Sequence, residues 1–273
     1  MKLDDVEASS IEVRKGGMKK AGAGVGIGGI IALVVGLLLS GGGGGGGAGS
    51  PDLGAILGQL QGGGAVASED EVVDGAKLEG QQEFVGKLRT LLDEYWTTEA
   101  TRLGVSFEAP GFVVFENAIQ TGGCGVGQPE AGPFYCPGDS KVYIDLGFYE
   151  KLEQQLDFDG DFALAYVLAH EYGHHIENLQ GMLGGGRSNA ESVKVELQAD
   201  CYAGAWGGWI DEEGRITAED FDEAIRAANA VGDDAIQGSG ANQDTFTHGS
   251  SEQRETAFRT GFDGGPAACR YKS

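Results

Sequence analysis

The feature that most constrains the fold is a helical pattern over 161–180 that carries apolar and ionisable side chains together. Leu164, Val167 and Leu168 recur at the spacing of a helix face that packs in a core. The same stretch contains His170-Glu171-Tyr172-Gly173-His174. Ionisable groups inside a core need hydrogen-bond or charge partners. The chain must therefore fold so that other polar residues meet this helix.

The two histidines of this stretch have the spacing of metal ligands. His170 and His174 are four residues apart, so they project from one helix face about one turn apart. Glu171 lies beside the first histidine, where it could take a proton from activated water without binding the metal. Zinc in a hydrolase uses three protein ligands and keeps one position open. The pattern predicts a zinc site; two histidines that merely share a helix face are the alternative.

Counting residues along the next helix predicts the third ligand. If that helix runs back antiparallel after a short loop, Glu196 comes level with His174 and Asp200 with His170, because both helices rise equally per residue. Glu196 is therefore the predicted third ligand. Asp200 is expected to accept the free ring N–H of His170 and fix its tautomer. A surface charge on a long helix is the alternative for either acid.

Other residues complete the predicted site. His248 is the only histidine outside the active helix, and we expect it to stabilise an oxyanion; a capping or surface histidine is the alternative. His175 points about 100° away from His174 and is expected to be a neighbour and not a ligand. The strand around 142–145 could offer an edge to an extended peptide, or could be internal.

A second feature is the stretch 21–40, which contains no charged residue and follows several Lys and Arg residues. It predicts a transmembrane helix, with 1–20 in the cytoplasm by the positive-inside rule and the rest of the chain outside. A cleaved signal peptide is the alternative, but no clear cleavage site follows. Residues 41–80 are rich in glycine, which predicts a flexible tether. The globular domain is then expected over 81–273.

Within that domain the periodicity predicts an α+β fold that is mainly helical, with a small β region. Cap patterns beginning at Thr217 and Ser250 mark two helix starts. Helices are expected around 84–95, 147–156, 161–180, 190–212, 217–236 and 250–262, and strands at 111–115 and 141–145.

The four cysteines fit an exported domain, where an oxidising compartment lets thiols pair. Three pairings are possible. We favour Cys124 with Cys136, which closes a local loop, and Cys201 with Cys269, which pins the C-terminus to the helical core. Metal binding by cysteine is the weaker interpretation, because the spacing does not resemble a zinc knuckle.

The formal net charge of −23 argues against a nucleic-acid partner, since phosphates must be met by a surplus of Lys and Arg. The acids are scattered along the chain, which favours a role in solubility over a dedicated cationic partner.

Four longer motifs resemble those of the bacterial neutral zinc metallopeptidases, which have one N-terminal membrane helix and a gluzincin-like HExxH site. The motifs are Gly132-Pro133-Phe134-Tyr135-Cys136-Pro137, His170 to His175, Glu196 to Gly204 and Thr247 to Arg254. The resemblance covers most of 81–273 and implies a zincin-like domain, one zinc ion per chain and a peptide or protein substrate. Ala257 departs from it, since that family is expected to prefer tryptophan there. A metzincin is excluded, because Glu177 and Gln180 stand where it needs glycine and histidine.

A function of another class is also compatible with the motifs, namely a catalytically silent, zinc-stabilised binding module outside the cytoplasm. Glu171 distinguishes the two, because a structural zinc site needs no carboxylate beside its first ligand and closes with a fourth protein ligand. The sequence does not identify a substrate or an oligomeric state.

Overall fold

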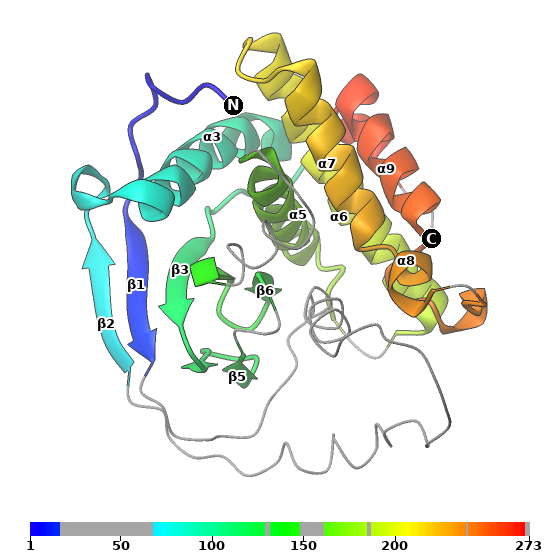
Figure 1. Ribbon diagram of the computed structural model, residues 1–273, viewed down its shortest axis with the longest axis horizontal. Coiled ribbons are helices and arrows are strands. Elements are labelled where there is room, and N and C mark those ends of the chain that lie inside the picture. The colour runs from blue at the N-terminus through cyan, green and yellow to red at the C-terminus, as the bar shows by residue number, and fades with distance from the viewer. Residues whose placement is uncertain (17–67, 129–131, 148–160, 185–186, 239, 271–273) are drawn as a thin grey trace.

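The computed structural model describes residues 1–16, 68–128, 132–147, 161–184, 187–238 and 240–270 (Figure 1). Its main sheet has five strands in the order β2-β1-β3-β7-β6. The β1–β3 and β3–β7 pairs are parallel, whereas β1–β2 and β6–β7 are antiparallel. The strands are β1 (Ile11–Gly16), β2 (Ser68–Val73), β3 (Gly111–Glu116), β6 (Phe134–Cys136) and β7 (Lys141–Asp145). A separate pair joins β4 (Ile119–Gln120) to β5 (Val126–Gly127).

The two predicted strands are confirmed as β3 and β7, and both are buried on both faces. Phe112 and Val114 belong to the main core, while Val113 and Phe115 lie in a second cluster with Phe134 and Tyr143. Of the two alternatives for 142–145, the internal strand is the one present where β7 lies between β3 and β6, since β6 pairs with Val142 and Tyr143. Periodicity shows which residues are buried and not which strands are neighbours.

The N-terminal residues belong to the same domain. β1 pairs with β3, Leu3, Val6 and Ile11 are buried in the main core, and the Met1 ammonium lies 3.1 Å from the carboxylate of Asp220. The predicted domain start at 81 therefore falls too late. The predicted membrane helix at 21–40 lies outside the described residues, and no helix among those described is long and apolar enough to cross a membrane.

The helices confirm the mainly helical α+β class. Figure 1 shows α5 between the sheet and a group formed by α6, α7 and α9, while α3 lies across one end of the sheet. Every residue of α5 from Phe162 to Glu177 is buried. The ionisable side chains of this helix therefore need partners inside the core. The helices are α3 (Gly80–Arg102), α5 (Phe162–Leu179), α6 (Asn189–Glu212), α7 (Ala218–Ala230), α8 (Asp233–Gln237) and α9 (Ser251–Gly264).

Helix boundaries follow local capping chemistry. The boxes predicted at Thr217 and Ser250 are both present at the starts of α7 and α9. The single helix predicted over 217–236 is wrong, because the chain is extended at Gly232 and a new helix begins at Asp233. A side chain at Gly232 would lie 2.3 Å from the Ser251 nitrogen, so this break lets α9 approach closely. The helix predicted at 147–156 lies almost wholly outside the described residues.

Helices α6 and α9 touch backbone to backbone. A Cβ on Gly204 would lie 1.9 Å from the Phe258 carbonyl oxygen, and one on Gly261 would lie 1.8 Å from that of Cys201. Glycine is therefore required at both positions, and the contact brings α9 against the face of α6 that carries the candidate site.

Two disulfides have the predicted pairing. Cys124, in the turn between β4 and β5, bonds to Cys136 at the end of β6, and Cys201 on α6 bonds to Cys269 after α9.

Candidate metal centre

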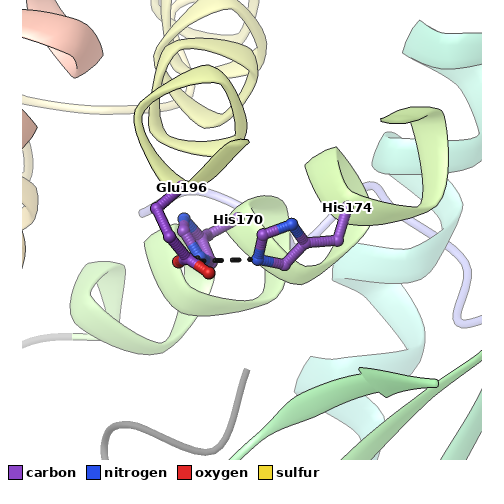
Figure 2. A group of neighbouring side chains, drawn as sticks. All are labelled: His170, His174 and Glu196. Atoms are coloured by element: carbon purple, nitrogen blue, oxygen red, sulfur yellow. Dashed lines mark ion pairs between the residues drawn. The ribbon is translucent and has the colours of Figure 1, made fainter. Parts of the chain in front are cut away.

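Three side chains from two antiparallel helices converge on one point. Figure 2 shows His170 and His174 projecting from one helix and Glu196 from another. Glu196 Oε2 lies 3.3 Å from His170 Nε2 and 3.7 Å from His174 Nε2. All three residues are buried, and their ligand atoms lie within 4.8 Å of one another. Asp200 lies at His170 as expected from the sequence, whereas Glu196 reaches both histidines and lies nearer to His170 than to His174.

The hydrogen bonds of the two histidines show that this group is built for a cation. His170 Nδ1 lies 2.8 Å from Asp200 Oδ1, and His174 Nδ1 lies 2.8 Å from Glu177 Oε2. Carboxylates accept, so both Nδ1 atoms donate; in the neutral form of each ring, the Nε2 atom then presents a lone pair. His174 Nε2 and Glu196 Oε2 are buried with no hydrogen-bond partner in the described chain. Acceptors facing acceptors are compensated by a metal ion, and two nitrogens with one oxygen are a donor set that suits zinc.

The buried charges around Glu196 fix its ionisation. Burial acts to raise the pKa of Glu196, but the positive charge of His174 in its protonated form outweighs burial and holds that pKa well below its ordinary value. Burial likewise acts to lower the pKa of His170, and the Asp200 carboxylate outweighs it and raises that pKa. Glu196 is thus ionised and ready to bind a cation at neutral pH.

Asp200 is held by more than the histidine that it was expected to orient. Arg254 donates to both of its oxygens, from Nε at 2.7 Å and from Nη2 at 2.9 Å, and Tyr166 OH donates to Oδ1 at 2.6 Å. The Arg254 charge overcomes burial and keeps the pKa of Asp200 low. Arg254 is therefore an ion-pair partner of Asp200, which fixes the plane of the carboxylate that faces His170.

Glu171 is buried beside the ligand group and anchored by the sheet. The backbone N–H of Tyr135, on edge strand β6, donates to Glu171 Oε2 at 2.7 Å. Burial raises the pKa of Glu171 to about 7, although the charges of His174 and His170 act to lower it. A carboxyl group with this pKa can both take up and release a proton near neutral pH.

His248 is held at the edge of the site by Asp233. The carboxylate of Asp233 accepts backbone N–H groups from Thr247, His248 and Gly249, and its Oδ1 lies 3.2 Å from His248 Nδ1. A Cβ on the neighbouring Gly249 would lie 3.2 Å from Leu197 Cδ2 on α6, so the fold brings the segment that carries His248 against the helix that carries Glu196.

His175 is not part of the ligand group, as expected. Its Nε2 donates to the backbone carbonyl of Glu108 at 2.7 Å, and its Nδ1 accepts from Tyr135 OH at 3.0 Å. Both ring nitrogens face away from the metal ligands.

Sequence reasoning missed Glu177, Asp233 and Tyr166. Glu177 could have been found, because it lies three residues after His174 on the same helix face. Asp233 was assigned to the interior of a single predicted helix, and Tyr166 belonged to the predicted helix over 161–180 but to no motif. Neither position therefore indicated a role in the site.

The comparisons with known proteins agree with this geometry. Residues 2–271 match the family described as "Putative neutral zinc metallopeptidase", so the chain belongs to that family. It is 37% identical over 285 residues to the uncharacterized protein YpfJ of Escherichia coli strain K12, covering 96% of this chain and 95% of YpfJ. It is also 40% identical over 183 residues to the uncharacterized protein Rv2575 of Mycobacterium tuberculosis, covering 60% of this chain and 62% of that protein. No solved structure matches.

Proposed function

We propose that this protein is a zinc-dependent peptidase that hydrolyses peptide bonds in peptide or protein substrates. The observation that carries the proposal is the convergence of the Nε2 atoms of His170 and His174 with Glu196 Oε2 next to the buried carboxyl group of Glu171. When bound there, zinc supplies Lewis acidity that activates water and polarises a carbonyl group. One ion is proposed per chain.

Glu171 is the proposed general base. Its Oε2 is engaged by the Tyr135 N–H, so the carboxyl group is fixed in orientation and the other oxygen is left to take the proton of the attacking water. The same carboxyl group then passes the proton to the leaving amine. Its pKa of about 7 suits both transfers.

His248 is the proposed donor to the oxyanion of the tetrahedral intermediate. Asp233 accepts from its backbone N–H and faces its Nδ1, so the ring is oriented before substrate binds. Replacing Asp233 would release both the loop and the ring.

The rival function, a silent zinc-stabilised binding module, requires a closed metal site. Within the described ranges, the metal-binding group consists of three side chains. This supports a site with an open position. The buried carboxyl group of Glu171 supports the peptidase as well, because a structural site has no use for it.

We also propose that the domain works outside the cytoplasm and is attached to a membrane by 21–40. The two disulfides support the first part, since such bonds persist in oxidising compartments. Modification of cysteines in the native cell with a membrane-impermeant thiol reagent, before and after reduction, tests it: labelling only after reduction is expected.

The test of the proposed function compares Glu171→Gln with Glu196→Ala. Glu171→Gln should retain zinc, because Glu171 is not a ligand, and should lose about 10²- to 10⁴-fold in cleavage of unfolded protein. Glu196→Ala should lose zinc, as measured by metal analysis after dialysis. Equal inertness of the wild-type protein and Glu171→Gln on a broad peptide library would contradict the proposal. Undiminished zinc in Glu196→Ala would contradict the ligand assignment.

A further inference from the structure

The two ligand histidines are backed by carboxylates in very different surroundings. Asp200, behind His170, receives hydrogen bonds from Arg254 and Tyr166 in addition to the histidine. Glu177, behind His174, is fully buried, and its Oε1 has no hydrogen-bond partner in the described chain. Its Oε2 lies 2.8 Å from His174 Nδ1.

We infer that Glu177 is a positioning residue that holds the His174 ring with its Nε2 lone pair toward the metal site. The inference rests on the proposed metal site but not on peptidase activity. A histidine ligand can be bound through either ring nitrogen, and the hydrogen bond of the other nitrogen decides which one faces the metal. Here the Glu177 carboxylate accepts from Nδ1 and thereby assigns Nε2 to the site.

The hydrogen bond to His174 Nδ1 is the main interaction of Glu177 in the described chain. A buried carboxylate is costly unless positive charge or donors compensate it. Asp200 has the Arg254 guanidinium, whereas the donor facing Glu177 is the His174 ring. The contribution of Glu177 therefore lies in orienting the ligand and in favouring a cation at the site.

The other contacts of the His174 ring that the described residues show do not choose between its two nitrogens, and the Glu196 carboxylate, 3.7 Å from Nε2, is itself a proposed ligand. The His174 ring is fully buried and meets the ring of His170 edge-on, at 4.7 Å between ring centroids. This edge-to-face ring contact involves no hydrogen bond, so it does not determine which ring nitrogen of His174 faces the metal site. Hydrogen bonding by Glu177 supplies the selection.

The experiment measures zinc affinity by competition with a chromophoric chelator for the full-length wild-type protein, Glu177→Leu and Glu177→Gln. Glu177→Leu removes the acceptor and should bind zinc about 10- to 100-fold more weakly. Glu177→Gln keeps a carbonyl oxygen in the same place and should recover most of that loss.

The matched control is Gln198→Leu. Gln198 is a buried polar residue on α6 that donates to Tyr202 OH and to the Cys269 carbonyl, and neither hydrogen bond involves a proposed ligand. This variant should unfold at a lower temperature and bind zinc within twofold of the wild-type protein. A loss of affinity shared by Gln198→Leu would show a general effect of core damage and overturn the inference.

Two further results would overturn it: zinc affinity of Glu177→Leu within twofold of wild type, or equal losses in Glu177→Leu and Glu177→Gln. If Glu177→Leu does not fold, Glu177→Asp replaces it, because the shorter side chain withdraws the carboxylate from Nδ1 and should also weaken binding. Failure of the wild-type protein to bind zinc would instead refute the proposed function.

Discussion

The pH dependence of stability should contain a contribution from His175 that can be isolated by one substitution. The ring is 1% exposed and is held between the Glu108 carbonyl and Tyr135 OH. A carbonyl oxygen only accepts, so Nε2 carries the hydrogen, and Nδ1 accepts from the tyrosine. The ring is therefore neutral in the folded protein. Burial lowers its pKa to about 4, although the Glu108 carbonyl acts to raise it.

The size of the effect follows from the two pKa values. In the unfolded chain the ordinary pKa is 6.5, so between pH 6.5 and about pH 4 the unfolded state binds a proton that the folded state does not. The free energy of unfolding therefore falls as the pH falls through this window. The loss is about 2 kcal/mol between about pH 7.5 and pH 5, and it approaches about 3 kcal/mol near pH 4.

The perturbation is His175→Gln, whose amide can still donate to the Glu108 carbonyl but does not titrate. Urea unfolding at both pH values, followed by tryptophan fluorescence, should show the wild-type protein losing about 2 kcal/mol more than the variant. Asn178→Ala is the control, since Asn178 also contacts Tyr135 OH and cannot titrate. It should keep the wild-type pH dependence. Equal losses in the wild-type protein and His175→Gln would refute the reasoning.

Two other predictions concern stability. Arg254→Met should lower the free energy of unfolding by about 3–5 kcal/mol, because it leaves the buried carboxylate of Asp200 without its cation; calorimetry would check this, and a change below about 1 kcal/mol would count against the ion pair. Replacing Cys201 and Cys269 together by alanine should cost about 4 kcal/mol, since the bond closes a separation of 68 residues. Urea unfolding measures the second effect, and a cost near zero would be the contrary result.

The sequence best predicted the positions of site residues that are set by regular helix geometry. Two antiparallel helices joined by a short loop place Glu196 and Asp200 level with the two histidines, because the rise per residue is the same on both helices. In the fold Asp200 lies at His170, and Glu196 reaches both histidines.

Positions that depend on tertiary packing could not be predicted in the same way. Arg254 reaches Asp200 only because Gly204 and Gly261 let α6 and α9 touch, and no spacing rule encodes that contact. Asp233 holds His248 only because the predicted helix over 217–236 is interrupted. β1 was missed because its two pairing partners lie far along the chain and only Ile11 and Val13 alternate within it.

The position of β1 determines which parts of the chain share a compartment. β1 lies between β2 and β3, and Gly16 faces Ser68 across the β1–β2 pair, so the chain leaves the sheet and returns to it at one place. A helix that crosses a membrane once puts its two flanks on opposite sides. A chain that crosses once at 21–40, with its N-terminus in the cytoplasm, would therefore lose β1 from the sheet and leave β3 with an open edge. The sheet therefore keeps Met1 to Gly16 in the same compartment as the metal centre.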